Sequence, residues 1–220
     1  MNACIVVPIK TNNTRLPGKN TKMLAGKPLY SYLFNTLKKV KEAGLAEIFV
    51  DSSDENILKI ARQWNFKTVK RPKEYNSDTT NGDDLINRIV SKLNFEIVGQ
   101  LFVTSPFLSF DAIKFAIVSM KKNNYDSLFG VVKRQNRFWF KSKPINHDLN
   151  KLLRTQDLTP VYEESDLYFF KKSSFLKYKK RICGKYKAIS VRKLESVDID
   201  YPEDFVYAES LIKSKLVILE

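Results

Sequence analysis

Apolar runs alternate with amphipathic segments along the first half of the chain. Residues 3–9 are apolar throughout, which is typical of a strand that is covered on both faces. Residues 28–40 carry apolar side chains at three- and four-residue spacing, and Gly44 suits the end of the helix that this spacing predicts. The chain therefore opens with a buried strand and a helix that packs one face inward.

The same alternation continues for three further pairs of elements. Strands are expected over residues 47–53, 66–72 and 97–106, and helices over residues 55–64, 83–93 and 110–122. Strands that alternate with helices in this way form a parallel sheet with helices on both faces. We therefore predict the α/β class, with a mostly parallel sheet flanked by helices in a single domain over residues 1–220.

The pattern changes after the next strand, which is expected over residues 125–134. Residues 134–180 combine short aromatic pieces with irregular stretches, which indicates a small aromatic-rich insertion or flap. Residues 188–200 return to strand character, and residues 201–216 are expected to form a closing helix with Pro202 near its first turn.

The insertion carries aromatic side chains that require a cover, namely Phe138, Trp139, Phe140 and Tyr168. They either fold back onto their own domain or are covered by a second copy of the chain. We expect the second arrangement, a homodimer that uses residues 134–180.

The net charge of +14 would attract polyanions, including nucleic acid. The lysines are spread along the whole chain, however, so a solvated surface is favoured and nucleic-acid binding is not expected. A small anionic substrate is a third interpretation. No apolar run approaches the roughly 20 residues that span a bilayer, and the start of the chain shows no secretory leader, so we expect a cytoplasmic protein without a membrane partner.

The loop after the first strand, residues 8–20, concentrates cations and amides. It contains Lys10, Asn12, Asn13, Arg15, Pro17, Gly18, Lys19 and Asn20. Cations and amide donors around a glycine suit a phosphate. The P-loop and G-x-G-x-x-G patterns are both absent, so this pattern also fits a plain charged turn.

Two further loops follow strands of the expected sheet and carry polar side chains. In residues 71–84 the hydroxyls and amides either cap the third helix or read a base or ribose. Thr104 and Ser105 either satisfy a turn or bind a ligand hydroxyl. Both loops belong to the carboxyl edge, where open parallel sheets bind ligands.

The segment "SVDID" holds two carboxylates at strand spacing. Alternation would place Asp198 and Asp200 on one face, about 7 Å apart. Two such carboxylates repel each other unless a cation lies between them, and Mg²⁺ prefers carboxylate and phosphate oxygens. The alternative is that the two aspartates cap the final helix.

Four motifs occur in the order found in a known family. "TRLPGKN" followed by "LAGKPLYSYLFNTL" resembles the opening signature of the CMP-sugar-acid synthetases, the cytidylyltransferases of sialic acid, Kdo and related acids. "RPKEYNSDTTNGDDLI" is similar to their second motif, "TSP" to their third and "DIDYPEDFVYAE" to their closing motif. "RTQDLTPVYEESDLYFFKKSSF" also resembles a segment of acylneuraminate cytidylyltransferase-like proteins. The resemblance spans residues 3–212.

This resemblance implies a nucleotide-binding α/β fold that uses CTP and Mg²⁺. The implied reaction is attack by the anomeric hydroxyl of a sialic-acid-like sugar acid on the α-phosphate of CTP, which releases pyrophosphate. It also implies a homodimer in which the insertion reaches the partner's site.

Site roles carry over by position. The resemblance implies nucleotide binding by Lys10, Arg15, Gly18, Lys19, Asn20, Arg71 and Ser77, contact with the sugar acid by Thr104 and Ser105, Mg²⁺ binding by Asp198 and Asp200, and catalysis by Arg15, Lys19 and Asp200.

The chain departs from the family on the acceptor side. Lys10 stands where the family commonly has Arg, and Phe102, Val103 and Leu108 replace an amide-containing motif and a following Arg. "EESDLYFF" replaces an Asn-Gly pair. The alternatives are therefore another acceptor such as a Kdo-type acid or a phosphonate, another base or a sugar phosphate, or a basic binding protein with impaired catalysis.

Overall fold

The computed structural model describes residues 1–10, 13–77 and 79–217. The strands are β1 (Ala3–Pro8), β2 (Met23–Leu24), β3 (Lys27–Pro28), β4 (Glu47–Ser52), β5 (Lys67–Lys70), β6 (Ile97–Leu101), β7 (Ser127–Arg134), β8 (Trp139–Phe140), β9 (Lys143–Pro144), β10 (Val161–Lys171) and β11 (Tyr186–Ser190). The α-helices are α1 (Leu29–Glu42), α2 (Glu55–Gln63), α3 (Gly82–Ile89), α4 (Phe110–Lys122), α5 (Lys172–Tyr178) and α6 (Pro202–Lys213). Short 3₁₀ helices are η1 (Lys19–Thr21), η2 (Lys73–Asn76), η3 (Val90–Lys92) and η4 (Thr155–Asp157).

Seven of the described strands form one sheet in the order β11-β7-β10-β6-β1-β4-β5. Neighbouring strands run parallel except at β10, which is antiparallel to both β6 and β7. The prediction of a mostly parallel sheet is therefore confirmed. The carboxyl ends of β1, β4 and β6 share one edge, and the loops expected to bind a ligand leave the sheet there.

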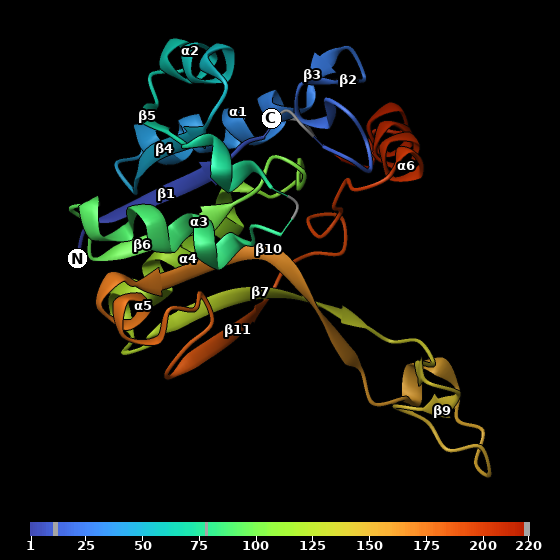
Figure 1. Cartoon of the computed structure of the whole chain (residues 1–220). Coiled ribbons are helices and arrows are strands. Elements are labelled where there is room, and N and C mark those ends of the chain that lie inside the picture. The colour runs from blue at the N-terminus through green and yellow to red at the C-terminus, as the bar shows by residue number, and fades with distance from the viewer. Residues whose placement is uncertain (11–12, 78, 218–220) are drawn as a thin grey trace.

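Helices cover both faces of this sheet because β1 is apolar on both sides (Figure 1). Ile5 and Val7 pack into a core with α1, α2 and α4, whereas Cys4 and Val6 pack into a second core with α3 and Phe175 of α5. Each fully buried Ile, Val or Phe side chain of this kind contributes about 1.5–3 kcal/mol to folding.

A third apolar cluster joins the C-terminal helix to the loops at the carboxyl edge. It contains Leu16, Leu24, Leu29, Tyr32, Phe107, Val197, Ile199, Phe205, Ala208 and Leu211. Two of these side chains lie next to polar loop residues, since Leu16 follows Arg15 and Ile199 separates the two aspartates of "SVDID". The cluster therefore fixes segments that are almost 200 residues apart in the chain.

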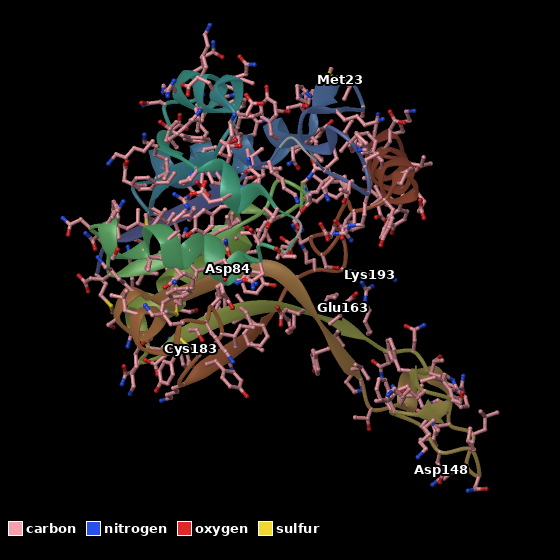
Figure 2. All side chains as sticks on the ribbon, viewed as in Figure 1. Met23, Asp84, Asp148, Glu163, Cys183 and Lys193 are labelled. Atoms are coloured by element: carbon pink, nitrogen blue, oxygen red, sulfur yellow. The ribbon has the colours of Figure 1, made fainter. Side chains whose placement is uncertain are left out.

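The insertion is smaller than the expected range 134–180. Residues 161–171 form β10, which lies in the middle of the sheet between β7 and β6. Phe169 and Phe170 point into opposite cores, so this aromatic run is fully buried. Only residues 135–160, which we call the arm, project beyond the sheet, and Asp148 lies near its far end (Figures 1 and 2).

The expected strand character of residues 188–200 holds only for its first three residues. β11 ends at Ser190, and the "SVDID" segment pairs with no strand of the described sheet. None of the helices in the described part of the chain is long and apolar enough to cross a membrane.

Candidate active site

A pocket of about 320 Å³ opens at the carboxyl edge of the sheet. Its walls contain the predicted site residues Lys10, Arg15, Lys19, Asn20, Arg71, Ser77, Thr104, Asp198 and Asp200. Gly18 and Ser105 lie next to wall residues and do not line the pocket themselves. Asn12, one of the expected amides of the loop, lies outside the described residues.

The loop after β1 is held in shape by Gly18, whose φ of 66° is in the left-handed region. Its carbonyl accepts hydrogen bonds from the backbone N–H of Thr21 at 3.0 Å and of Lys22 at 3.1 Å. No described atom lies within 4 Å of the position that a Cβ would occupy, so glycine is required here for its backbone conformation. This turn begins η1 and directs Lys19 into the pocket.

Lys19 and Arg15 both pair with Asp200. Lys19 is 7% exposed, and its ammonium donates to Oδ1 of Asp200 at 2.7 Å and to the carbonyl of Ile199 at 2.9 Å. Arg15 Nη1 donates to Oδ2 of Asp200 at 2.6 Å. Both oxygens of Asp200 therefore face cations of the loop, so Asp200 is charge-compensated before any metal binds.

The two aspartates of "SVDID" do not cap the final helix. Asp204 does so, because its Oδ2 accepts from the backbone N–H groups of Asp200 at 3.0 Å and Tyr201 at 2.8 Å. The backbone N–H of Ile199 donates to the carbonyl of Thr104 at 2.9 Å, which fastens the segment to the loop after β6. Asp198 and Asp200 thus reach the pocket wall without belonging to a regular strand.

A third carboxylate, that of Asp166, faces the same pocket and was missed by the sequence reasoning. Burial raises its pKa above the ordinary value, while Ser105 Oγ donates to its Oδ2 at 3.0 Å. Burial among the pocket walls, and then the charge of Asp166, raise the pKa of Asp198 to about 7. The sequence signal for Asp166 was a lone acid within an aromatic run, "SDLYFF".

These carboxylates suit Mg²⁺ only with help from substrate oxygens. In the part of the chain that the structure describes, no group of three His, Cys, Asp or Glu side chains could hold a metal by itself. Mg²⁺ commonly uses one or two carboxylates together with substrate phosphates and water. Asp198, which repels Asp166 and has no ion-pair partner among the described residues, fits that donor set best.

Arg71 is held at the back of the pocket by Asp51. It is 2% exposed, its Nε donates to Oδ2 of Asp51 at 3.0 Å, and its Nη2 donates to the Asp51 carbonyl at 2.7 Å. Arg88 also pairs with Asp51. Burial lowers the pKa of Arg71 from its ordinary value. Arg71 therefore presents a fixed cationic edge to the pocket.

The loop 71–84 shows one of its two expected roles, the cap of α3. Asn81 caps α3, since its side chain accepts from the N–H of Asp83 at 2.8 Å and of Asp84 at 3.1 Å. Ser77 Oγ lies 2.9 Å from the hydroxyl of Thr80, and both residues line the pocket. The helix cap thus positions a pair of hydroxyls at the rim.

Asn13 and Asn20 contribute buried acceptors without a donor. They are 8% and 5% exposed, and the Oδ1 atom of each has no hydrogen-bond partner among the described residues. The Nδ2 group of Asn20 donates to the carbonyl of Lys10 at 2.6 Å, so its orientation is fixed. An unpaired buried acceptor costs about 1–3 kcal/mol, and a ligand donor in this pocket would remove that cost.

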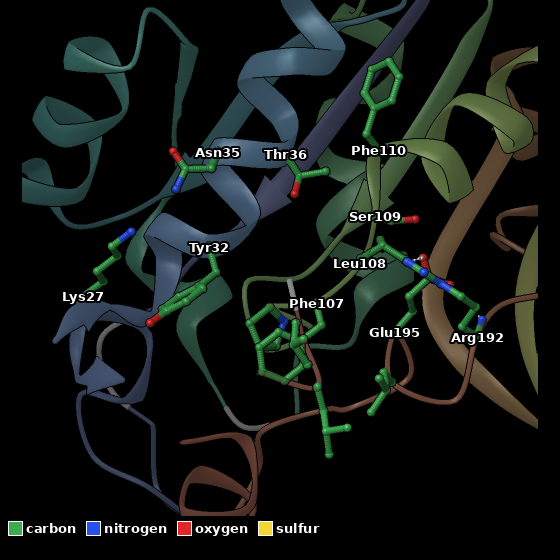
Figure 3. Close-up of a pocket in the computed structure, with 14 residues that line it drawn as sticks. Lys27, Tyr32, Asn35, Thr36, Phe107, Leu108, Ser109, Phe110, Arg192 and Glu195 are labelled. Carbon is green, nitrogen blue, oxygen red and sulfur yellow. Dashed lines mark hydrogen bonds and ion pairs between the residues drawn. The ribbon is translucent and has the colours of Figure 1, made fainter. Parts of the chain in front are cut away.

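The apolar replacements on the acceptor side have different locations. Phe102 and Val103 line the pocket, although Val103 is also part of the core. Leu108 lies instead in a second pocket, of about 230 Å³, beside Ser109 and the ion pair of Arg192 with Glu195 (Figure 3). Leu108 thus does not contribute to the wall of the candidate site.

Comparison with known proteins agrees with this geometry. A family model described as "Cytidylyltransferase" matches residues 4–220. The chain belongs to this cytidylyltransferase family. The resemblance to the CMP-sugar-acid synthetases is thereby confirmed.

Curated members of the family with similar sequences make CMP-linked acids, according to their names. N-acylneuraminate cytidylyltransferase A of Danio rerio is 28% identical over 206 residues, which cover 90% of this chain and 47% of that protein. CMP-N,N'-diacetyllegionaminic acid synthase of Legionella pneumophila is 26% identical, with 97% of each chain covered. The chain spans about half the length of the first relatives that it matches.

Solved structures share the fold. A CMP:2-keto-3-deoxy-manno-octonic acid synthetase in complex with CTP has a TM-score of 0.73 at 15% identity, and the match covers 98% of this chain and 100% of that one. A 4-diphosphocytidyl-2C-methyl-D-erythritol synthase of Anaerococcus prevotii has a TM-score of 0.66 at 16% identity. At these identities the comparison supports the α/β fold alone.

Proposed function

We propose that this member of the cytidylyltransferase family transfers CMP from CTP to the anomeric hydroxyl of a sialic-acid-like sugar acid. The anomeric oxygen forms a bond to the α-phosphorus as its proton is lost, and the bond from that phosphorus to the bridging oxygen breaks. Pyrophosphate leaves. The names of the relatives support the sugar-acid class, and CTP, a cytoplasmic metabolite, makes a cytoplasmic location part of the proposal.

The proposed binding of cytidine rests on two amide oxygens that lack hydrogen-bond donors in the described part of the chain, those of Asn13 and Asn20. The Oδ1 atoms of Asn13 and Asn20 are buried in the pocket and lack donors among the described residues. Cytosine offers an exocyclic amino group and ribose offers hydroxyls, which are the donors that such oxygens require. Arg71, fixed by Asp51, adds a donor edge on the same side.

The proposed binding of the CTP triphosphate rests on the cations of the loop after β1. Lys10, Arg15 and Lys19 line the pocket together, and phosphoryl-type transfer depends mainly on charge neutralisation and alignment. Phosphate oxygens would compete with Asp200 for Arg15 and Lys19, so CTP binding would release part of the Asp200 carboxylate. Asp198 and Asp200, with phosphate oxygens, would then hold Mg²⁺, which supplies Lewis-acid stabilisation of the transferred phosphate.

Pyrophosphate release provides the test of this function. The purified chain with Mg²⁺ is incubated with CTP, UTP, ATP or GTP and with sialic, legionaminic, pseudaminic or Kdo-type acids. We expect release with CTP and at least one sialic-acid-like acid. Pyrophosphate release only with UTP, ATP or GTP would indicate a nucleotidyltransferase of the same fold that is specific for another base. No pyrophosphate release with CTP and any acid of the panel would contradict the proposal.

We further propose that the protein is a homodimer joined through the arm. The arm exposes large apolar side chains, namely Trp139, Phe140, Ile145, Leu149 and Leu152, and Leu152 is 82% exposed. Gln135 fastens its base, since Nε2 donates to the carbonyls of Gln156 at 2.8 Å and Leu158 at 3.1 Å. A fixed segment with an apolar surface suits a second copy.

Light scattering at micromolar concentration tests the assembly. We expect a dimeric mass for the wild-type chain and a monomeric mass for the double variant Trp139→Ser, Phe140→Ser. The variant Phe115→Ser, which removes an exposed aromatic from α4 outside the arm, serves as the control and should remain dimeric. A monomeric wild-type protein would contradict the assembly.

A further inference from the structure

Asp166 occupies a position at the carboxyl edge that no other carboxylate on β10 shares. β10 pairs with β6 from Lys171 to Leu167, and Leu167 lies opposite Leu101, the last residue of β6. Asp166 is the next residue of β10, so it lies where β6 gives way to the loop that contains Phe102. The pairing of β10 with β7 shifts between Ser165 and Tyr168, and such irregularities redirect side chains. Asp166 lines the pocket.

The carboxylate of Asp166 keeps part of its hydrogen-bonding capacity. Oδ2 accepts from Ser105 Oγ at 3.0 Å, and no other hydrogen bond or ion pair to Asp166 occurs within the described ranges. A carboxylate has about four acceptor positions on its two oxygens. Oδ1 therefore keeps acceptor positions that no described protein group fills.

The neighbouring cations are committed to other groups. Lys19 donates to Asp200 and to the Ile199 carbonyl, and the Arg181 side chain donates to Asp83 at 2.9 Å and to Gln100 at 2.9 Å. Both act on Asp166 only through space. Oδ1 is therefore free to accept from solvent or from a molecule bound in the pocket.

The wall around Asp166 offers little other polar chemistry. Phe102 and Val103 present apolar surface, and the side chain of Thr104 acts on Asp198, whose pKa it lowers. This wall therefore resembles a specificity pocket, in which a few polar groups on an apolar surface fix the orientation of a ligand.

We propose that Asp166 is a specificity-determining residue for the acceptor, which it recognises by accepting a hydrogen bond from a hydroxyl or ammonium group. An acceptor that lacks this donor, or that places a carboxylate there, leaves the Asp166 carboxylate unpaired and is rejected. This inference rests on the function proposed above and adds the chemistry of its acceptor side.

A purely structural role makes a different prediction. If Asp166 only holds Ser105 in place, then Ser105→Ala and Asp166→Ser should have the same effect, since each breaks the same hydrogen bond. Glu164→Gln is the matched charge control, because Glu164 lies on the same strand, accepts from the Tyr168 hydroxyl at 2.7 Å and does not line the pocket.

The experiment compares acceptors that differ by one group. Wild type, Asp166→Ser, Asp166→Asn, Ser105→Ala and Glu164→Gln are assayed with N-acetylneuraminate, Kdo and their single deoxy and amino-deoxy analogues. We expect Asp166→Ser to raise the KM of the preferred acceptor at least tenfold, with the KM of CTP changed less than twofold. At least one deoxy analogue that wild type disfavours tenfold should no longer be disfavoured by Asp166→Ser.

The Asn variant identifies the donor. Asn keeps an acceptor oxygen without the charge, so a hydroxyl partner predicts a smaller loss than in Asp166→Ser, and an ammonium partner predicts an equal loss. Glu164→Gln should retain the wild-type ranking of acceptors. An unchanged ranking in Asp166→Ser, or an equal change in Ser105→Ala, overturns the proposal.

A binding measurement separates this inference from the proposed function. Saturation-transfer NMR with the CTP-loaded protein detects each acid without turnover. If pyrophosphate is never released but an acid binds wild type and not Asp166→Ser, the acceptor role stands while the transfer reaction fails. Equal binding to both overturns the role of Asp166, and binding of no acid to wild type overturns both proposals.

Discussion

The two walls of the pocket differ in how their polar groups are satisfied. On the wall proposed to bind the nucleotide, which we call the nucleotide wall, Lys19 and Arg15 already share Asp200, and Arg71 pairs with Asp51. On the wall proposed to bind the acceptor, which we call the acceptor wall, Asp166 accepts one hydrogen bond among the described residues, from Ser105, beside the apolar side chains of Phe102 and Val103. The polar groups of the first wall are thus paired with each other in ion pairs, whereas the second wall places one carboxylate beside apolar side chains.

This difference indicates that the two walls respond to mutation in different ways. Changes on the nucleotide wall disturb ion pairs that exist before ligand arrives, so they should alter CTP use regardless of the acceptor. Under the proposed function, changes on the acceptor wall should remove contacts made only with the second substrate. The following expectations test that division, from the largest effect to the smallest.

Asp200→Asn should reduce turnover by at least about a hundredfold, because loss of its charge removes several kcal/mol of metal-assisted stabilisation. It should not raise the melting temperature, since Asp200 is paired with Lys19 and Arg15. Turnover is measured by pyrophosphate release at saturating CTP across a magnesium titration. Asp204→Asn, in which Asn can still cap α6, is the control. Near-normal turnover of Asp200→Asn at ordinary magnesium would exclude the metal role.

Lys19→Ala should weaken CTP use about tenfold to a hundredfold, since a charge-assisted hydrogen bond contributes about 1.5–3 kcal/mol. The loss should be the same for every acceptor, and it should appear in kcat/KM for CTP. Lys22→Ala removes a cation from the same loop outside the pocket and should have little effect. Unchanged steady-state constants for CTP in Lys19→Ala would contradict a role of Lys19 in CTP binding.

Asn13→Ala should raise the KM of CTP up to about tenfold, consistent with a net hydrogen-bond contribution of about 0.5–1.5 kcal/mol. Since Oδ1 of Asn13 has no partner in the described structure, the variant should keep or gain thermal stability. Steady-state kinetics and thermal melting together give the result. A lower melting temperature with an unaltered KM would show that Asn13 serves the fold instead.

Phe102→Leu should have the smallest effect, a two- to threefold rise in the KM of the acceptor. It removes an edge contact between the Phe102 and Tyr168 rings, whose centroids are 6.4 Å apart, and such pairs contribute about 0.5–1.5 kcal/mol. The KM of CTP should stay constant. If the KM of CTP changes more than the KM of the acceptor, the division of the pocket into two walls is wrong.

The sequence by itself determined the fold class and most of the elements. The period of its apolar residues gave β1, α1, β4, α2 and α4 nearly to their ends, since local sterics and amphipathic burial act within one segment. Its polar loops also named most of the residues that line the pocket, because strands of a parallel sheet deliver their following loops to one edge.

Tertiary structure decided how those residues are paired. β10 was taken for an insertion because its partners β6 and β7 lie tens of residues away and its aromatic residues have no simple period. The pairing of Lys19 with Asp200 spans 181 positions, and it exists because a third apolar cluster holds Leu16 against Ile199. Asp166 lies at the carboxyl edge because β10 pairs with β6, a strand that is distant in the sequence. Such contacts arise from packing between distant segments, and local pattern carries no information about which distant carboxylate will meet which cation.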